Sequence, residues 1–289
     1  MINLDKNKYW VWFSLIENLG SRKKQELLKK YNNPQRIYNL KKEDIVKIPG
    51  FSEKRAEMIL DKKKRYELND YLQKMKKENV DIITIEDDEY PRILKNIYDY
   101  PISLYIKGNK KILNNKSIGI VGCRIASEYG IKVAQYFAYK LAQKGINIIS
   151  GLAKGIDSNS HIGAIKAKGI TIGIVGNGLD IVYPKENYKL YSEILKNDGA
   201  IISEYPLGTK PEKINFPARN RIISGMSNGI IVVEAKKKSG TLITVDCALE
   251  QGRDVYVVPG NINSANSLGT NELIKQGAKM VTKYDDIEI

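Results

Sequence analysis

Short runs of apolar residues recur along the chain from residue 117 onward, and glycine or polar residues bound each of them. Their length and their content of Val and Ile are typical of buried strands. Six runs predict strands, namely Ser117–Val121, Ile146–Ser150, Ile170–Val175, Ala200–Ser203, Ile230–Glu234 and Val255–Val258. The segments between them have apolar residues at helical spacing and predict helices, namely Glu128–Lys144, Ser158–Lys168, Tyr188–Lys196, Ala218–Met226 and Leu242–Gly252.

Apolar strands that alternate with helices of this length indicate βαβ units, in which a helix carries the chain back to the start of the next parallel strand. We therefore expect residues 79–289 to form an α/β domain with an extended Rossmann-like, doubly wound and mostly parallel sheet. Residues 84–106 are a mixed stretch with turn signals at Tyr90-Pro91 and Tyr100-Pro101. Ligands of such a sheet bind beyond the carboxyl ends of its strands.

Residues 1–78 show helical spacing throughout and predict a small all-α domain, which ends in a lysine-rich connecting helix over residues 62–78. Two of its segments are alike. Leu19-Gly20-Ser21-Arg22 and Ile48-Pro49-Gly50-Phe51-Ser52 each place a glycine turn and a serine N-cap before a basic helix. This pattern is typical of helix-hairpin-helix or SAM-like modules, whose turn amides can hold a DNA phosphate. The alternative is a helical bundle without a ligand.

Composition narrows the class of protein. Cys123 and Cys247 lie far apart and His161 is the one histidine, so the chain lacks the ligands for a zinc site and predicts reduced thiols. Its apolar runs, such as Ile230–Val233, are too short to cross a membrane. We therefore expect a cytoplasmic protein without a metal and without membrane contact.

Lys and Arg outnumber Asp and Glu by 47 to 33, which gives a formal charge of +14. Residues 1–80 hold 20 of the basic and 11 of the acidic residues and so carry +9 of this charge. A positive field favours polyphosphate partners such as nucleic acids. The alternative is a solvated lysine surface that reflects a biased nucleotide composition of the genome.

Glycine and polar residues collect at the first two predicted strand ends. Gly122, Arg124 and Ser127 follow the first strand, and Ser150 and Gly151 end the second. Glycine allows the backbone to approach a ligand closely, and the next helix N-terminus offers free amides. These residues therefore predict an anion site.

Asp157 and His161 lie just beyond the second strand. They could act as acid and base, but no nucleophile motif accompanies them. We interpret Asp157 as a helix N-cap and His161 as a packed core residue.

The later strand ends add cations and an aromatic residue. A turn after the third strand contains Asn177 and Gly178, and Ser239 and Gly240 open the helix after the fifth. The fourth strand leads to a loop and helix that contain Lys213, Phe216, Arg219, Asn220 and Arg221. An aromatic ring among cations, on a loop before a helix, is what a groove for single-stranded nucleic acid needs, because bases stack on rings and cations neutralise phosphates. The alternative is a core phenylalanine beside solvated arginines.

Two common nucleotide motifs are absent. G-x-G-x-x-G occurs nowhere, since Gly176 and Gly178 are followed by Ile181, and no glycine precedes a lysine as a P-loop requires. The sequence therefore argues against an NAD dehydrogenase and against a P-loop ATPase.

Seven motifs follow one another between residues 80 and 289. They are Arg124-x-x-Ser127-x-Tyr129-Gly130, Ser150-Gly151-x-Ala153-x-Gly155-Ile156-Asp157, Tyr183-Pro184, Phe216-Pro217-x-Arg219-Asn220-Arg221-Ile222-Ile223, Val233-Glu234-Ala235, Ser239-Gly240-Thr241-Leu242-Ile243-Thr244 and Val258-Pro259-Gly260. In this order they resemble the DprA/Smf family of DNA-processing proteins. The order is far more specific than any single motif.

This resemblance implies a non-catalytic protein without a cofactor, which binds single-stranded DNA, forms a homodimer, protects incoming single strands and loads the RecA recombinase onto them, as in natural transformation. It places the strand pocket on Arg124, Lys213 and Phe216, with backbone contacts from the turn at Asn177 and Gly178. Unlike many members, the sequence ends without a winged-helix-like C-terminal domain. The residues expected to contact DNA are Gly122, Arg124, Ser127, Ser150, Gly151, Asn177, Gly178, Lys213, Phe216, Arg219, Asn220, Arg221, Ser239 and Gly240, of which either Arg219 or Arg221 can instead be structural.

An enzyme of another class is the alternative, namely a Rossmann-like nucleotide phosphoribohydrolase related to the lysine-decarboxylase-like proteins. Such enzymes carry P-G-G-x-G-T-x-x-E. The nearest segment here, residues 239–244, lacks the paired glycines and the glutamate.

Overall fold

A nine-stranded sheet forms the centre of the computed structural model, which describes residues 4–16, 19–61 and 65–289. The strand order is β1-β2-β6-β5-β4-β3-β7-β8-β9. The strands are β1 (Asp81–Thr84), β2 (Ser103–Gly108), β3 (Ser117–Gly122), β4 (Asn147–Ser150), β5 (Thr171–Val175), β6 (Ala200–Ser203), β7 (Gly229–Glu234), β8 (Asp254–Val257) and β9 (Lys279–Met280). β3 to β9 run parallel to one another, whereas β2 is antiparallel to both β1 and β6.

The expected α/β class and the mostly parallel sheet are confirmed, and the six predicted strands are β3 to β8. The sequence prediction missed β1, β2 and β9. β1 and β2 form an antiparallel extension of one edge and lie at the two ends of residues 84–106, the mixed stretch with turn signals. β9 has two residues, and its Lys279 and Met280 are exposed, so it has no apolar run.

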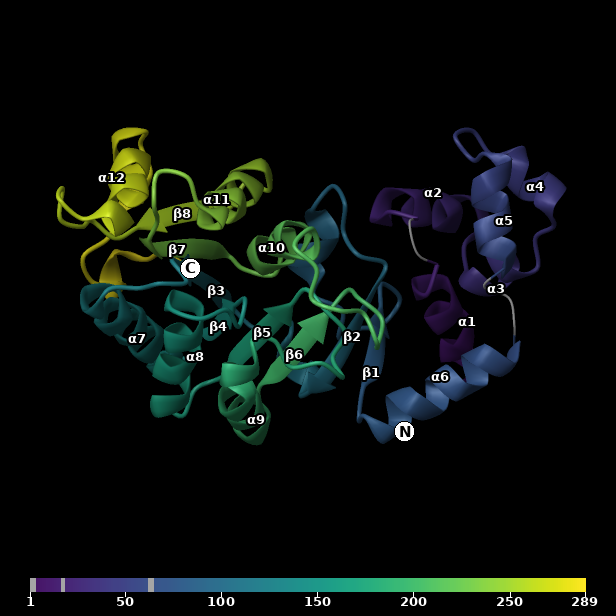
Figure 1. The fold of residues 1–289 in the computed structure, drawn as a ribbon, viewed down its shortest axis with the longest axis horizontal. Helices are drawn as coiled ribbons and strands as arrows, with labels where there is room; N and C mark the ends of the chain where they lie inside the picture. Colours follow the sequence, from purple (N-terminus) through teal and green to yellow (C-terminus); the bar gives the residue numbers. More distant parts are fainter. Residues whose placement is uncertain (1–3, 17–18, 62–64) are drawn as a thin grey trace.

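Helices cover both faces of the sheet (Figure 1). One face carries α7 (Glu128–Gln143), α8 (Ile156–Lys166) and α9 (Tyr188–Lys196), and the other carries α10 (Asn215–Gly225), α11 (Gly240–Glu250) and α12 (Leu268–Lys275). Ala134, Phe137 and Leu141 are four or three residues apart on α7, and this spacing packs them together against Ile118 and Ile120 of β3. None of the described helices is both long and apolar enough to cross a membrane.

The start of α10 differs from the prediction. The helix begins at Asn215 instead of Ala218, so Phe216 lies in its first turn and not on a preceding loop. Pro217 explains the error, because proline breaks a helix interior but is tolerated in the first turn, where its missing N–H has no partner to bond.

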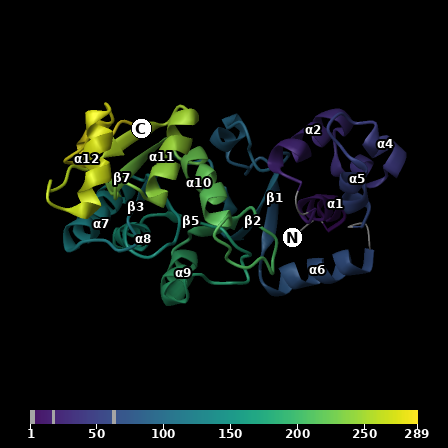
Figure 2. The same ribbon diagram turned by 45° about the horizontal axis from the view of Figure 1, so that its top comes forward.

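In the described part of the N-terminal segment, six helices precede the sheet and lie beside its β1–β2 edge (Figures 1 and 2). They are α1 (Leu4–Ser14), α2 (Ser21–Tyr31), α3 (Pro34–Tyr38), α4 (Lys42–Val46), α5 (Glu53–Asp61) and α6 (Arg65–Lys77). This agrees with the expected all-α segment, and α6 with the connecting helix, although its residues 62–64 lie outside the described residues. Ser21 is not an N-cap as predicted, since it is the first residue of α2 and its hydroxyl donates to Glu204.

The helical segment and the sheet share one buried core. Trp10 and Met75 belong to the same apolar cluster as Ile82 of β1, Tyr105 of β2 and Leu207. The division into domains at residues 1–78 and 79–289 stays a prediction. A cut at this boundary would expose apolar surface on both sides.

Candidate nucleic-acid interface

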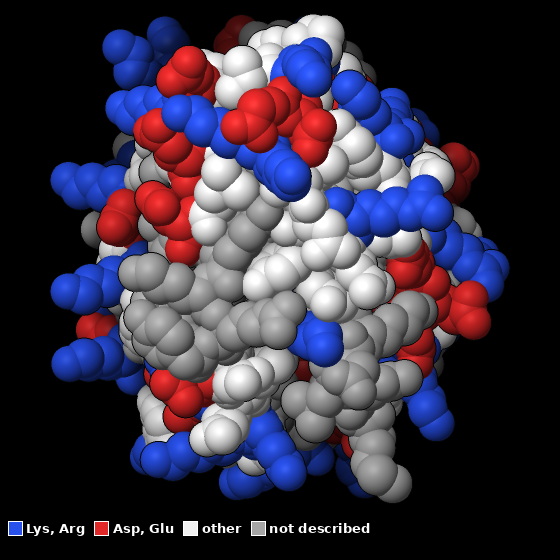
Figure 3. Space-filling model, turned by 90° about the vertical axis from the view of Figure 1, so that its right-hand side faces the viewer, with Lys and Arg blue, Asp and Glu red and all other residues white. Residues whose placement is uncertain are grey.

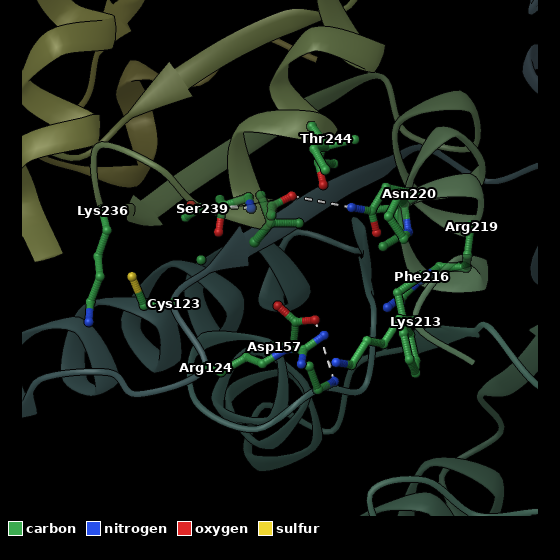
Figure 4. Close-up of a pocket in the computed structure, with 18 of the residues that line it drawn as sticks. Cys123, Arg124, Asp157, Lys213, Phe216, Arg219, Asn220, Lys236, Ser239 and Thr244 are labelled. Atoms are coloured by element: carbon green, nitrogen blue, oxygen red, sulfur yellow. Dashed lines mark hydrogen bonds between the residues drawn. The ribbon is translucent and has the colours of Figure 1, made fainter. Parts of the chain in front are cut away.

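A cavity of about 710 Å³ opens beyond the carboxyl end of β3, between the N-terminal parts of α10 and α11 (Figure 4). The residues that line it come from segments far apart in the sequence, as expected where parallel strands end at one edge. Eight predicted site residues line the cavity, namely Gly122, Arg124, Lys213, Phe216, Arg219, Asn220, Ser239 and Gly240. Asn220 and Gly240 also join α10 to α11, since the Asn220 amide donates to the Gly240 carbonyl at 3.4 Å.

Two exposed cations reach into the cavity. Arg124 and Lys213 extend toward Asp157 from opposite walls (Figure 4). Within the part of the chain that the structure describes, neither forms an ion pair. Lys236, a third exposed cation, lines the cavity before the N-cap of α11, Ser239. The cavity therefore combines exposed cations with the start of a helix, and both features favour an anion.

An aromatic ring lies beside these cations. Phe216 is half-buried, and the guanidinium carbon of Arg124 is 5.6 Å from its ring centroid. The ring of Tyr183, which also lines the cavity, has its centroid 5.6 Å from that of Phe216. The cavity thus combines phosphate-binding cations with aromatic surface.

Two buried side chains of opposite charge, Arg219 and Asp157, line the cavity and are 4% and 7% exposed. Arg219 donates to the carbonyl of Ile174. Burial lowers the pKa of Arg219 to about 10, while Asp157 acts to raise it. Burial also raises the pKa of Asp157, against the opposing effect of Arg219. Asp157 is the second residue of α8 and not its N-cap, so its predicted role is wrong.

Gly151 makes room for this pair. A Cβ atom on Gly151 would lie 2.1 Å from an Arg219 nitrogen and 2.6 Å from an Asp157 oxygen. The absence of a side chain at Gly151 thus leaves space for these two groups, and its contact with DNA stays a prediction.

Arg221 points away from the cavity. Its guanidinium pairs with Glu204 and, at 3.1 Å, with Asp99, while Glu204 also accepts a hydrogen bond from Ser21 at 2.7 Å. The structure thus gives both predicted arginines internal partners, but only Arg219 lines the cavity.

Four further predicted residues do not line the cavity. Ser150 is buried and donates to the carbonyl of Ile120. Asn177 is also buried, and its amide donates to the carbonyls of Gly178 and Ile181. Gly178 itself donates to Thr209 across the neighbouring loop. These groups hold the loops that surround the cavity, and their contact with DNA stays a prediction.

Ser127, the fourth, caps α7, because its hydroxyl accepts from the amide of Gly130. It also donates to the buried carboxylate of Glu234, which accepts from the Ser127 amide at 3.0 Å and from Asn266 at 3.3 Å. An internal carboxylate thus occupies this helix N-terminus, where the sequence predicted space for a phosphate.

Glu234→Gln is expected to lower the free energy of unfolding by about 1–3 kcal/mol, because the new amide nitrogen would face a donor and leave it unsatisfied. Urea unfolding measures this change. Glu128→Gln, an exposed change in the first turn of α7, should shift stability by less than about 0.5 kcal/mol. Equal stability of Glu234→Gln and the native chain would contradict this account of the α7 N-terminus.

His161 is fully buried and packed, as interpreted from the sequence. Its Nδ1 is hydrogen-bonded to Thr171 at 2.6 Å, and burial lowers its pKa to about 3. The imidazole is therefore neutral near pH 7 and lies away from the cavity that Asp157 lines.

Sequence reasoning missed Tyr183, Lys236 and the threonines Thr241 and Thr244 as cavity residues. Tyr183-Pro184 stood among the family motifs, and Lys236 begins a run of three lysines, so both had a signal. The threonines also stood in a family motif, that of residues 239–244, but the position of α11 is needed to show that both face the cavity.

A family model described as DNA recombination-mediator protein A matches residues 81–288. DNA processing protein DprA of Bacillus subtilis (strain 168) is 46% identical over 213 residues, which cover 73% of this chain and 71% of the relative. The X-ray structure of DNA processing protein A from Streptococcus pneumoniae is 36% identical, covers 96% of both chains and has a TM-score of 0.84. The structure of the Helicobacter pylori protein, solved to explain its single-stranded DNA binding mode, is 30% identical with a TM-score of 0.65, over 72% of this chain and 94% of that one.

Proposed function

The chain belongs to the DNA recombination-mediator protein A family, and from this premise we propose that it is a cytoplasmic, non-catalytic mediator that binds single-stranded DNA. The observation that carries the proposal is the cavity in which two exposed cations, Arg124 and Lys213, lie beside an aromatic ring, Phe216. The cations would neutralise phosphates, and the ring would stack a base.

The recessed position of the ring favours a single strand over a duplex. Bases of a duplex are stacked on one another, so they are not available to a ring inside a cavity, whereas an unpaired base can enter and stack. Phosphate contacts alone would bind both forms. Strand preference therefore rests on the aromatic part of the cavity.

The finer parts of the proposal are that the protein protects incoming strands, loads RecA onto them as in natural transformation, and acts as a homodimer. They are supported by family membership and not by any single residue. The alternative, a nucleotide phosphoribohydrolase, has less support, because Asp157 and Glu234 are both engaged internally and Ser239 serves as the N-cap of α11.

Gel-shift titration of single-stranded against double-stranded DNA tests the proposal, with and without RecA. Preferential binding of the single strand is expected, together with faster RecA filament formation. The same preparation should hydrolyse neither ATP nor nucleoside monophosphates and should not cut DNA. Equal affinity for both forms, or steady turnover of a nucleotide, would contradict it.

The N-terminal helices are expected to strengthen DNA binding through the long-range attraction of their positive charge. On the face that Figure 3 shows, the described Lys and Arg side chains project around the periphery and are interspersed with Asp and Glu. Replacing the exposed Lys47 and Lys54 with glutamate should weaken DNA binding several-fold at about 50 mM salt. The same change should have little effect at about 500 mM salt, because salt then screens charges over a short distance.

Fluorescence anisotropy at both salt concentrations measures this effect, and Lys47→Arg with Lys54→Arg is the charge-matched control. A loss that persists at high salt would instead support direct contact by the hairpin at Gly50, as the helix-hairpin-helix pattern allows.

A further inference from the structure

Two aromatic side chains from distant segments form one layer in the cavity wall. Tyr183 follows β5, and Phe216 lies in the first turn of α10. Their ring centroids are 5.6 Å apart and their planes are inclined by 32°, so the two rings pack against each other with a tilt. Both rings line the cavity.

Phe216 is enclosed by its neighbours. Arg124 lies over the ring, with its guanidinium carbon 5.6 Å from the centroid. The backbone of Gly176 is so close that a Cβ atom there would lie 3.2 Å from a Phe216 ring carbon. With Tyr183 beside it as well, Phe216 is held in place by three neighbours while it still lines the cavity.

Tyr183, in contrast, is 42% exposed. In the described part of the chain its hydroxyl has no hydrogen-bond partner, whereas exposed Tyr129 donates to the carbonyl of Pro259. No hydrogen bond within the described part of the chain thus explains why this exposed ring is a tyrosine. It is a large aromatic surface at the mouth of a positively charged cavity.

We propose that Tyr183 is a base-stacking surface of the DNA site, with Phe216 as the inner ring that supports it. This inference rests on the proposed binding of single-stranded DNA and adds a nucleobase subsite to it. A base stacked on Tyr183 would lie next to the row of side chains formed by Arg124, Phe216 and Tyr183. The phosphates of the bound strand would remain near the positive charges of Arg124 and Lys213. Every base has an aromatic face, so the subsite accepts any sequence.

Fluorescence of Tyr183→Trp tests the contact directly. The native tryptophans, Trp10 and Trp12, are 3% and 0% exposed in α1, away from the cavity, so they contribute a constant background. Oligothymidylate should quench the new tryptophan, because a stacked base lies against the indole. An abasic oligomer with the same number of phosphates should bind weakly and leave the emission unchanged at saturation.

Tyr188→Trp is the matched control, since Tyr188 is 66% exposed, lies five residues further along and does not line the cavity. Its emission should not respond to either oligomer. If the native chain bound no oligomer, the proposed function would fail. If the native chain bound oligothymidylate but Tyr183→Trp was not quenched, the stacking inference alone would fail.

Affinity gives a second, independent measurement. Tyr183→Ala should weaken binding of oligothymidylate about 5- to 150-fold without changing the dependence on salt, as loss of one stacked base predicts. Tyr183→Phe, which keeps the ring, should bind within about 2-fold of the native chain. Native affinity of Tyr183→Ala, or an equal loss in Tyr183→Phe, would overturn the proposal.

Discussion

Arg219→Ala is expected to lower the free energy of unfolding by about 3–5 kcal/mol near pH 7, although Arg219 lines a cavity proposed to hold DNA. The reason is Asp157, a buried carboxylate whose neighbouring cation would be lost. The carbonyl of Ile174 would lose its Arg219 donor as well. An unpaired buried charge costs far more than an exposed one, so the loss should appear first in stability.

The deficit should depend on pH. Burial raises the pKa of Asp157 in the folded chain, and Arg219 opposes this effect, so Arg219→Ala should raise that pKa further. A carboxyl group whose folded pKa is raised binds its proton more tightly in the folded state. Its stabilising effect is complete below the unfolded pKa and is lost as pH rises through the folded pKa. The deficit of Arg219→Ala should therefore be smaller at about pH 5 than at about pH 8.

Urea unfolding at both pH values measures this difference. Arg219→Ala combined with Asp157→Asn should recover part of the stability at about pH 8, because the buried charge is gone. Lys213→Ala, an exposed cation of the same cavity, is the matched control and should change stability by less than about 0.5 kcal/mol. A stable Arg219→Ala chain would show that Asp157 does not depend on Arg219.

Sequence patterns predicted the parallel part of the sheet because its strands are buried on both faces. β5 and β7, for example, are buried at every position, so they appear as continuous apolar runs. β2 is also mostly buried, but it follows Tyr100-Pro101 and pairs antiparallel with β6, far along the chain. Neither its turn signals nor its local pattern indicates that pairing.

The location of the site could be predicted, but the direction of its side chains could not. Parallel strands end at one edge, and this was enough to bring Arg124, Lys213 and Phe216 together. Arg219 and Arg221 are two residues apart on α10, so they point to different sides of the helix. Which of them faces the cavity depends on Asp157 and Glu204, which come from other segments.

The contributions of charge and of stacking to DNA affinity should depend differently on salt concentration. Phosphate contacts release counterions, so Lys213→Ala should make the slope of log affinity against log salt shallower by about 0.7. Arg124→Ala should do the same and also disturb Phe216, which lies under its guanidinium. Lys213→Ala is therefore the cleaner variant. The exposed Lys210, which does not line the cavity, is its matched control, and Lys210→Ala should leave the slope nearly unchanged.

Phe216→Ala is expected to lower the affinity for single-stranded DNA by about 1–3 kcal/mol at every salt concentration, because stacking releases no counterions. In this cavity the loss has two sources, since Phe216 is itself an aromatic surface and also supports Tyr183. Thermal unfolding by circular dichroism must accompany the titrations, because removal of a half-buried ring also leaves a void. A Phe216→Ala chain that melts several degrees lower but binds single strands with native affinity would assign Phe216 to the core. The stacking model would then be wrong, and the cations alone would have to explain the binding of DNA.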